Sequence, residues 1–317
     1  MIEKSAHFEQ VKQHNRKLIR NTLREKSPMR IAELVNRTGL SYPTVSALLN
    51  ELISSQEVTV NPEAESCGGR PGQRYELNSA YQYALVMYFE DWELKQDVYD
   101  AYGKRVWSNS INVTGEICVE DLGVYVKEVK DRFCSLSTVV LGVPGAVCDG
   151  IIMHLPKFKM LEGSELKTYL QKIINIHHVL VENDINAIAL AEVNRFQNFA
   201  HITYVNGCIG TGIVLNGELV RGAKGYAGEL EYLCEDMNNQ ENTFATSILA
   251  LACVLDLPDI LISGEGCDEE TRLSVHRILA GTLPEIRIPK IHLADNMEGR
   301  YKRGLLMLAL FKWEKDE

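Results

Sequence analysis

Two acidic motifs in the second half of the chain carry side chains that could act on a hydroxyl group. The stretch "HHVLVEND" ends in Asn183 and Asp184, and the stretch "GAKGYAGELEYL" contains Glu229. A carboxylate just beyond the end of a strand can reach a hydroxyl and take its proton, as phosphoryl transfer to a sugar requires. A glycine-rich turn, "NGCIGTG", lies between the two motifs. This pattern raises the hypothesis of a sugar-phosphorylating enzyme.

A structural role for Asp184 is also compatible with its position. The residue precedes the helix-like stretch "INAIALAEV", where an aspartate can cap the helix N-terminus. Both roles can hold at once.

The segments that would position these carboxylates alternate between strands and helices. After Asn78 the sequence predicts hairpin-like strands in "YALVMYF" and "KQDVYDAYGKRVWSNSINV", then a helix over 119–133 and a buried strand in "TVVLGVPGAV". The buried strand "HHVLVEND" opens onto the helix that follows Asp184. Such alternation predicts an α/β fold in which ligands bind at the carboxyl ends of strands.

The front of the chain has a different pattern. Apolar residues at helical spacing predict a helix over 8–23, and "SPMRIAELVNRTGLSYPTVSALLNELISS" supplies two more helices. Ser27 is expected to cap the second helix, and Gly39 is expected to end it. Ser41 is expected to cap the third. A short glycine-containing turn between two such helices is the helix-turn-helix arrangement.

In a helix-turn-helix the second helix enters the major groove of DNA by its N-terminal residues. The residues expected to contact DNA there are Ser41, Tyr42, Thr44 and Ser46. The stretches "EVTV" and "QRYELN" predict a two-stranded wing joined by a loop that contains "CGGRPGQR". Glycines around Arg70 and Arg74 suit insertion of an arginine into a narrow minor groove.

We therefore expect residues 1–77 to bind double-stranded DNA. A protein-docking winged domain and a plain helical bundle stay open as alternatives. The candidate phosphate contacts, for which a merely solvated surface position is at least as compatible, are Arg16, Lys17, Arg20 and Arg37.

The charge distribution favours DNA binding at this end only. The chain has 317 residues and a net charge of −10. Residues 1–77 hold eleven Lys and Arg against nine Asp and Glu, a net charge of +2, which leaves −12 for the remaining 240 residues. These values disfavour a protein whose whole surface binds nucleic acid. The length predicts two or three domains.

The eight cysteines contain no C-x-x-C pair and no metal-ligand spacing. We expect reduced, mostly buried thiols, with neither a metal nor a cofactor. The sequence has no charged-then-apolar leader and no apolar run of about 18 residues, so we expect a cytoplasmic protein without a membrane segment.

The order of helix, helix-turn-helix and wing with a "GGRPG" tip, leading into this body, resembles the transcriptional repressors of the ROK family, named for repressors, open reading frames and kinases. Three body stretches are similar to family motifs: "LGVPGAVCDGII" to "GVPGPV", "VENDINAIALAE" to "NDANAAALAE", and "GAKGYAGELEYL" to "GxAGExGH". The resemblance runs nearly the whole length of the chain.

This resemblance implies a winged helix-turn-helix domain at 1–78, followed by a two-lobed, actin-like (ribonuclease-H-like) body of the sugar-kinase type. The first lobe is expected at 79–192 together with 298–317, and the second at 193–297. The last helix, over 300–313, is expected to pack back on the first lobe.

The resemblance also implies roles for individual residues. In kinases of the family the aspartate that matches Asp184 is the general base, while the residues that match Asn183 and Glu229 hydrogen-bond other sugar hydroxyls. Tyr232 stands where the family has a histidine that touches the sugar. These four residues are the expected ligand-binding set.

Departures from the family pattern argue against catalysis. The first phosphate turn of the kinases is "DxGGT", whereas this chain has "YFEDWELKQ", with Glu90, Asp91 and Glu93 where a phosphate would lie. The second, typically "GTGIGxG", is "NGCIGTG" here. The zinc motif "CxCGxxGC" is absent from the sequence: Cys234 stands alone until Cys253, so four ligands cannot gather in the family manner.

The leading hypothesis is therefore that the protein is a sequence-specific DNA-binding regulator of sugar-related genes. The resemblance implies a repressor, because repression is the usual mode of the family. It would not be an enzyme, and its body would sense a sugar or sugar phosphate. A homodimer or dimer of dimers is expected, because paired recognition helices read half-sites about 34 Å apart. Two alternatives stay open: a body that is only a dimerisation scaffold, and an active sugar kinase with a fused DNA-binding head.

Overall fold

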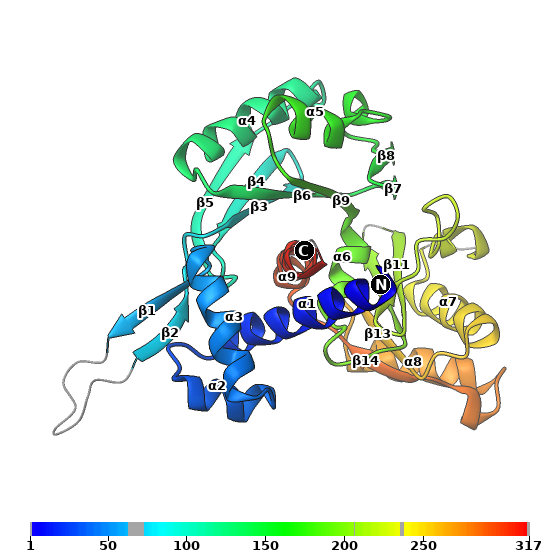
Figure 1. Cartoon of the computed structure of the whole chain (residues 1–317). Helices are drawn as coiled ribbons and strands as arrows, with labels where there is room; N and C mark the ends of the chain where they lie inside the picture. Colours follow the sequence, from blue (N-terminus) through cyan, green and yellow to red (C-terminus); the bar gives the residue numbers. More distant parts are fainter. Residues whose placement is uncertain (1, 63–72, 206, 235–237, 316–317) are drawn as a thin grey trace.

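The computed structural model describes residues 2–62, 73–205, 207–234 and 238–315. The chain begins with three helices and a two-stranded antiparallel hairpin, which we call the head (Figure 1). The bounds of its elements are α1 Ile2–Glu25, α2 Ile31–Thr38, α3 Tyr42–Ser54, β1 Val58–Pro62 and β2 Gln73–Leu77.

The turn between α2 and α3 is fixed by the residues that flank it. Gly39 ends α2 in the left-handed conformation, with φ at 70°, and its N–H bonds to the carbonyl of Val35. A side chain is disfavoured in that conformation, which explains the glycine. Ser41 caps α3 by accepting a hydrogen bond from the N–H of Thr44. Both caps agree with the sequence-based predictions.

The prediction for Ser27 was wrong. The N-cap of α2 is Arg30, and Ser27 instead donates from its hydroxyl to the carbonyl of Leu23 at the end of α1. The reason is that Met29 pairs with Tyr75 of β2 as an isolated bridge, with N···O distances of 2.9 and 2.7 Å. The segment before α2 is therefore extended rather than helical.

Every element of the head contributes to one hydrophobic core. Burial of a large apolar side chain stabilises the fold by about 1.5–3 kcal/mol, so this core is sufficient to hold the short helices in place. Its buried members are Ile19, Leu23, Met29, Leu34, Val45, Leu48, Leu49, Leu52, Val58, Tyr75 and Leu77.

The body contains two five-stranded sheets of the same topology, ordered β5-β4-β3-β6-β9 and β12-β11-β10-β13-β14. In each sheet the first three strands along the chain pair antiparallel, and two later strands add in parallel. The first sheet comprises β3 Tyr83–Glu90, β4 Glu93–Tyr99, β5 Arg105–Asn112, β6 Leu136–Val143 and β9 His178–Asn183. The second comprises β10 Phe199–Val205, β11 Cys208–Leu215, β12 Glu218–Leu219, β13 Asp259–Gly264 and β14 Lys290–Leu293.

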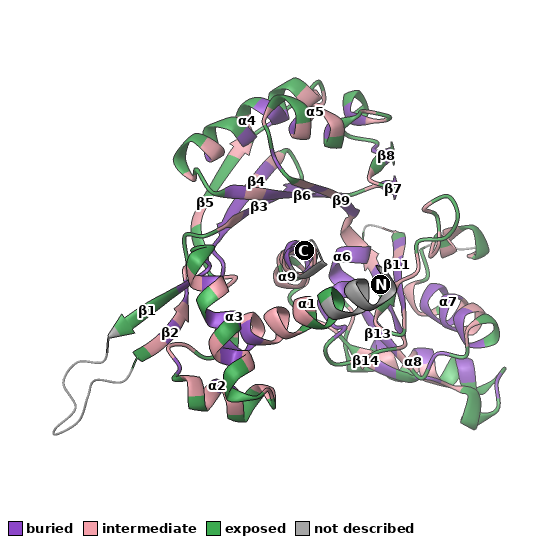
Figure 2. Cartoon of the chain, viewed as in Figure 1, coloured by how far each residue is buried: buried purple, intermediate pink, exposed green. Residues whose placement is uncertain are grey.

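Helices cover both sheets, and two helices lie between them (Figures 1 and 2). The first lobe is the first sheet with α4 Val119–Arg132 and α5 Leu166–Ile173 on its outer face, and the second lobe is the second sheet with α7 Gln240–Val254 and α8 Glu269–Ala280. The central helices are α6 Asp184–Leu190 and α9 Met297–Lys315. The remaining short elements are β7 Ala146–Cys148, β8 Ile151–His154, η1 Lys159–Leu161, η2 Leu230–Leu233 and η3 Glu285–Arg287.

Strand β3 shows why the first sheet is buried on both faces. Leu85, Met87 and Phe89 pack with the outer helices, whereas Ala84 and Tyr88 pack with the central helices. Successive side chains of a strand point to opposite faces, so the continuous apolar run "ALVMYF" fits a sheet between two helical layers.

The two central helices touch closely. A Cβ atom on Gly304 of α9 would lie 1.6 Å from the carbonyl oxygen of Ala187 in α6, so only glycine permits this approach. Arg300 of α9 forms an ion pair with Glu192, just after α6. The last helix packs on the first lobe as expected, and its Met307 also joins a cluster with residues of the second sheet.

No helix within the described ranges is both long and apolar enough to cross a membrane.

Candidate functional site

Asn183 and Asp184 lie where β9 meets α6. Asn183 is the N-cap of α6: its side-chain oxygen accepts from the N–H of Asn186 at 3.0 Å, and its amide nitrogen donates to the carbonyl of Gly145 at 2.9 Å. Asp184 is the first residue of the helix, and its carboxylate accepts from the N–H of Ile185 at 2.8 Å. The capping role considered for Asp184 thus belongs to Asn183.

The environment of Asp184 disfavours its charge. Burial raises the pKa of this carboxyl from 3.8 to about 6, and the like charge of Glu229 adds to the shift. The electrostatic interaction shows that the structure brings the two predicted carboxylates near each other, although 45 residues separate them in the chain. We call Asn183, Asp184 and Glu229 the carboxylate site.

Glu229 immediately precedes η2 and is exposed. Partial desolvation raises the pKa of its carboxyl, the nearby carboxylate of Glu231 raises the pKa further, and His154 of β8 opposes the shift. Tyr232 is 84% exposed on η2. The structure therefore brings Asn183, Asp184 and Glu229 together, whereas Tyr232 extends into solvent.

An ion pair that sequence reasoning missed connects this site to the second lobe. Glu182, the residue before Asn183, is 3% exposed, and its carboxylate accepts from Arg221 Nε at 3.1 Å and also from Arg221 Nη2. The other carboxylate oxygen accepts from the N–H of Asn183 and from the side chain of Asn186, each at 3.1 Å. A glutamate in the otherwise apolar strand "HVLVEN" was the available signal, because a buried charge needs a partner.

In the loop from Arg221 to Glu229, two glycines allow the backbone to pass close to neighbouring strands. Gly225 has φ at 77°, and a Cβ there would lie 2.3 Å from the carbonyl oxygen of Val147 in β7. Gly228 has φ at 95°, and a Cβ there would lie 2.1 Å from the carbonyl oxygen of Thr211 in β11. The glycines of "GAKGYAGE" thus serve to place Glu229 between the two lobes.

The turn between β3 and β4 carries bulky and acidic side chains. Glu90 pairs with Glu93 across the hairpin, so Asp91 and Trp92 form the turn. Lys157 lies 3.2 Å from the carboxylate of Asp91 and 5.8 Å from the ring centroid of Trp92. Phosphate sites use bare backbone N–H groups in glycine turns, which this hairpin does not present.

The corresponding turn of the second lobe joins β10 to β11. Val205 pairs with Cys208 across this hairpin, and Gly207 has φ at 73°. Asn206 lies outside the described residues. The two hairpins occupy the same place in the two sheets.

The predicted recognition residues cluster at the start of α3. Ser41 and Tyr42 are exposed, the latter by 58%, and the Ser41 hydroxyl lies 2.8 Å from that of Thr44. Thr44 and Ser46 are half-buried. The opposite face of α3 is anchored in the head core, so the polar end of the helix is held rigidly at the surface.

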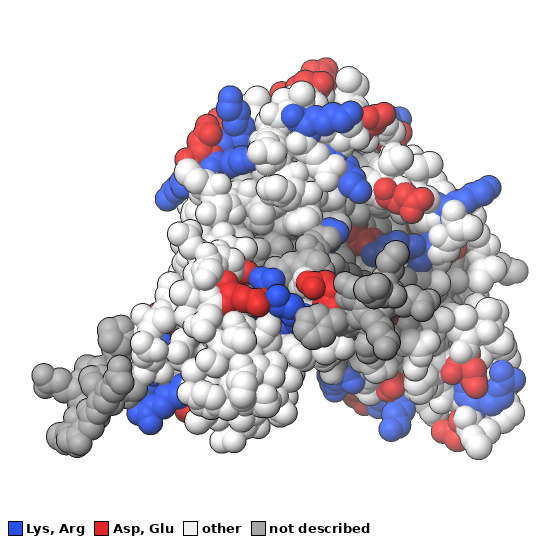
Figure 3. Space-filling model, viewed as in Figure 1, with Lys and Arg blue, Asp and Glu red and all other residues white. Residues whose placement is uncertain are grey.

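Of the two arginines predicted to contact DNA from the wing, only Arg74 is among the residues that the structure describes. Arg74 lies in β2, is half-buried, and donates to the carbonyl of Pro28 at 3.3 Å. Arg70 lies outside the described residues. In Figure 3 both Lys and Arg and Asp and Glu side chains lie on the face that is shown.

Comparison with known proteins shows which family domain the body contains. Residues 94–243 match the model of the ROK family. The chain contains a ROK family domain. It is 27% identical over 242 residues to a xylose repressor of Bacillus subtilis, covering 72% of this chain and 62% of that protein. It is also 27% identical over 253 residues to a xylose repressor of Staphylococcus xylosus, covering 73% and 63%. The matches thus span only about three-fifths of the relatives' length.

Solved structures share the fold. A ROK family transcriptional regulator, a homologue of the E. coli MLC protein, superposes with a TM-score of 0.68 at 17% identity, covering 95% of this chain and 99% of that one. A putative N-acetylmannosamine kinase from Listeria monocytogenes superposes with a TM-score of 0.61 at 18% identity, covering 73% of this chain and 100% of the kinase. The body of this chain therefore has the ROK sugar-kinase-like fold.

Two of the candidate phosphate contacts in the head form ion pairs with a buried carboxylate. Arg16 and Arg20 bind the carboxylate of Glu57 at 3.0 and 2.6 Å, and this glutamate is only 4% exposed. They neutralise a buried charge inside the head, and their side chains are largely covered. Lys17 lines a pocket between α1 and α9, and Arg37 lies 3.7 Å from Glu25 at the surface.

The cysteines that the structure describes are less buried than predicted. Cys134, Cys208 and Cys253 are exposed, and the others that the structure describes are half-buried. Cys234 points into the body, with its sulfur 3.6 Å from the carbonyl oxygen of Leu230. Within the described part of the chain, no group of three His, Cys, Asp or Glu side chains could hold a metal ion.

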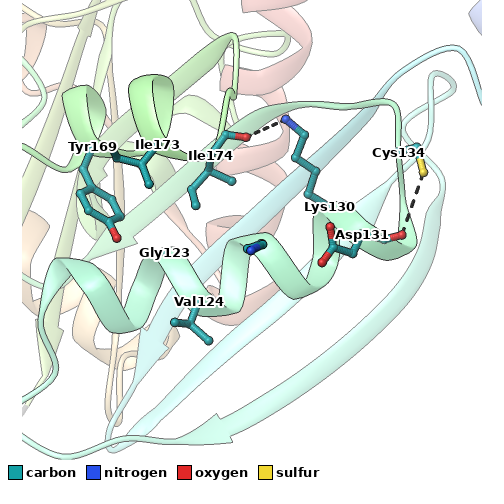
Figure 4. A pocket seen from close by; sticks show the side chains of 9 residues that line it. Gly123, Val124, Lys130, Asp131, Cys134, Tyr169, Ile173 and Ile174 are labelled. Carbon is teal, nitrogen blue, oxygen red and sulfur yellow. Dashed lines mark hydrogen bonds between the residues drawn. The ribbon is translucent and has the colours of Figure 1, made fainter.

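One pocket of about 560 Å³ lies on the outer side of the first lobe, between α4 and α5 (Figure 4). Val124, Tyr169 and Ile173 supply apolar lining. Lys130 spans its edge and donates to the carbonyl of Ile174 at 2.7 Å, so this cation caps the end of α5. The pocket is remote from the carboxylate site, which lies on the other face of the same sheet.

Proposed function

We propose that this chain is a DNA-binding transcriptional repressor whose ROK domain senses a sugar at the carboxylate site and does not phosphorylate it. Residues 1–78 would form a winged helix-turn-helix domain. Residues 79–192 with 298–317, and residues 193–297, would form the two lobes that bind the effector. A homodimer or dimer of dimers would present two heads to paired half-sites on DNA.

The observation that carries this proposal is the construction of α3. Its apolar face is locked into the head core, while its capped N-terminus presents Ser41 and Tyr42 to solvent. A recognition helix needs this combination, because base contacts require polar side chains on a rigid support. In the proposed complex Ser41, Tyr42, Thr44 and Ser46 read the major groove, while Arg70 and Arg74 follow the minor groove.

A sugar is the ligand that best fits the carboxylate site. Asn183 offers an amide, and Asp184 and Glu229 offer two carboxylates from opposite lobes, a donor and acceptor set suited to adjacent hydroxyl groups. The relatives named xylose repressors make a pentose the first sugar to test. Tyr232 would join the site when the lobes close, because η2 carries it beside Glu229.

The absence of phosphoryl transfer is part of the proposal. It is supported by the β3–β4 turn, where Asp91 and Trp92 take the place of glycines and like charge would repel nucleotide phosphates.

Selection from a random DNA library with the purified chain tests the DNA-binding function. We expect one enriched motif with two half-sites. Tyr42→Ala and Arg74→Ala should weaken binding to that motif at least tenfold, and Tyr226→Ala, an exposed tyrosine of the body, serves as the matched control. Failure to enrich any motif would contradict the proposal.

Thermal unfolding with a panel of pentoses, hexoses, amino sugars and their phosphates tests the sensing function. A ligand that binds the native state raises its stability by RT ln(1 + [L]/Kd). We expect a rise with one sugar that disappears in Asp184→Ala and in Glu229→Ala. No rise with any compound would favour a body that acts only as a dimerisation scaffold.

A sugar kinase is the second candidate function, and the pKa of Asp184 favours it. A carboxyl with a pKa of about 6 is well suited to act as a general base near neutral pH. ATP, magnesium and a sugar would then yield ADP, and Asp184→Asn would abolish the reaction. We expect no sugar-dependent ADP from the wild-type protein.

A further inference from the structure

The turn between β4 and β5, residues 100–104, touches both the head and the last helix of the body. We call it the joint turn. It belongs to the first lobe by sequence and by sheet pairing, because Tyr99 of β4 pairs with Arg105 of β5 immediately beside it. Its position at the boundary makes it a candidate for communication between the two parts.

Two hydrogen bonds attach the joint turn to the head. Arg24 of α1 donates from Nε to the carbonyl of Ala101 at 3.1 Å. The hydroxyl of Tyr102 donates to the carbonyl of Leu77, the last residue of β2, at 2.9 Å. The ring of Tyr102 also packs against the hydrophobic core of the head. A residue of the body thus completes the core of the DNA-binding part.

The joint turn is stiffened from within. Asp100 is 6% exposed, and one of its carboxylate oxygens accepts from the N–H groups of Tyr102 and Lys104, each at 2.9 Å. Gly103 adopts φ at 75°, which a side chain would strain. The turn therefore moves as one unit rather than bending residue by residue.

The other side of the joint turn faces α9. The Cβ position of Gly103 lies 3.6 Å from a methyl carbon of Leu310 and 3.7 Å from one of Leu306. Both leucines belong to the second half of α9. The two leucine side chains thus lie where a side chain at Gly103 would touch them, so α9 runs directly beside the joint turn.

The first half of α9 is fixed to the helix that carries the carboxylate site. Gly304 lies against the carbonyl of Ala187, and Arg300 pairs with Glu192. Asp184 is the first residue of that same helix, α6. A displacement of α6 by a ligand at Asp184 therefore has a rigid path to α9 and onward to the joint turn.

Nearby, α1 and α9 enclose a pocket of about 580 Å³. Asn21 and Arg24 of α1 face Met307 and Phe311 of α9 across it. At this place the two helices are separated by a space instead of interlocking side chains. A space of this kind permits α1 to change its distance from α9. The joint turn, next to this pocket, is where the head and the body are in direct contact.

We propose that the joint turn couples ligand binding at the carboxylate site to the DNA affinity of the head, with Tyr102 and Arg24 as the coupling residues. This inference rests on the proposed function. A ligand that prefers one arrangement of the lobes shifts α6 and α9, and the joint turn passes that shift to the end of α1 and to β2. Coupling of this type requires two sites and an element whose position both ligands bias.

The experiment compares the effect of D-xylose on DNA affinity in three proteins. DNA carrying the motif enriched by the wild-type protein is titrated in a fluorescence anisotropy assay, with and without D-xylose. The test variant is Tyr102→Phe combined with Arg24→Met, which removes both hydrogen bonds while retaining the ring and the aliphatic stem. The control is Tyr125→Phe, another half-buried tyrosine, in α4 of the first lobe.

In the wild-type protein and in the control, D-xylose should weaken DNA binding roughly tenfold, a typical allosteric coupling. In the test variant the Kd values for D-xylose alone and for DNA alone should stay within about threefold of wild type, while the effect of one on the other falls below about threefold. A purely structural role would lower both affinities and would leave their coupling unchanged.

The outcomes separate this inference from the proposed function. A test variant that keeps the tenfold effect, or that loses D-xylose or DNA binding itself, overturns the assignment of the joint turn and leaves the repressor function standing. A wild-type protein whose DNA affinity is unchanged both by D-xylose and by every sugar that raises its thermal stability overturns both the sensing function and this inference.

Discussion

At the scale of single residues, Asp184 is a candidate binding group whose surroundings disfavour its charge and so lower the stability of the fold. Its carboxylate is partly desolvated and lies near the carboxylate of Glu229. A sugar hydroxyl that donates to either group would relieve this unfavourable environment. Groups held in such environments are typical of functional sites, where stability is commonly sacrificed.

The first prediction concerns how the destabilising effect of Asp184 on the fold depends on pH. Because the pKa of Asp184 is raised from 3.8 to about 6 on folding, the native state binds the proton more tightly. The contribution of Asp184 to stability is therefore favourable below pH 3.8 and is lost as the pH rises through 6. Asp184→Asn should raise the free energy of unfolding by about 1–3 kcal/mol at pH 7.5 and should leave it unchanged at pH 3.5.

Denaturant unfolding at the two pH values measures this difference. Asp295→Asn, at a side chain that is 97% exposed, is the control and should show no effect at either pH. The same gain in stability at both pH values would mean that Asp184 carries no raised pKa in the folded protein.

At the scale of elements, the cap of α3 decides whether the recognition surface is held in place. Ser41 accepts from the N–H of Thr44. Ser41→Ala should lower the stability of the head by about 1 kcal/mol, because one backbone donor at the helix N-terminus loses its partner. Ser54→Ala, at the other end of the same helix, should lower the stability of the head by less. The Ser54 hydroxyl only donates to the carbonyl of Asn50, one turn earlier in the helix.

Hydrogen exchange of the α3 amides measures this effect locally. Protection should fall in the first turn of α3 in Ser41→Ala and should be preserved there in Ser54→Ala. Equal protection in the two variants would show that the cap does not stabilise this helix.

The loop that carries Glu229 supplies a second prediction at this scale. Arg221 anchors the loop to Glu182 in the first lobe, although Arg221 itself need not touch a ligand. Arg221→Ala should weaken sugar binding at least tenfold, because it leaves Glu182 buried without its charge partner and releases the loop. Arg221→Lys should restore part of the affinity, since a lysine keeps the charge but not the two-pronged geometry.

Calorimetric titration with the sugar identified by thermal unfolding measures these affinities. Arg272→Ala removes another arginine–carboxylate pair, with Glu269 on the surface of α8, and should bind sugar as the wild type does. If Arg221→Ala kept wild-type sugar affinity, the ion pair would have no part in positioning the site.

At the scale of the whole molecule, the repeated sheet topology produces two lobes with two central helices packed between them. The candidate ligand-binding residues come from both lobes, whereas the head contacts the body beside α9 and the joint turn (Figure 1). One helix, α9, therefore touches both lobes and the region where the head is attached. A change in lobe arrangement has a direct physical route to the head.

The prediction at this scale is the size of the DNA complex. The chain has a mass of 35.7 kDa, and we expect two chains on one selected DNA site. Sedimentation equilibrium on the complex measures the stoichiometry. A DNA in which one half-site is scrambled should bind at least tenfold more weakly, because only one head can then make base contacts. One chain per site with no loss on scrambling would contradict a dimer.

Much of the architecture followed from the sequence because it depends on neighbours within a few residues. The caps at Gly39 and Ser41, the hairpins and the helix over 119–133 were all predicted correctly. Asn183 and Asp184 were placed at a strand end for the same reason, since the change from strand to helix is visible in local spacing. The α/β alternation likewise indicated the fold class.

Other features were decided by tertiary structure alone. Glu182 meets Arg221 across 39 positions, and Arg20 meets Glu57 across 37. No local pattern selects such partners, because the choice depends on which distant segments the packing brings together. The position of α9 between the lobes has the same origin. The sequence by itself thus determined the elements and the kinds of residue at their ends, whereas folding decided which charged side chains are buried together as partners.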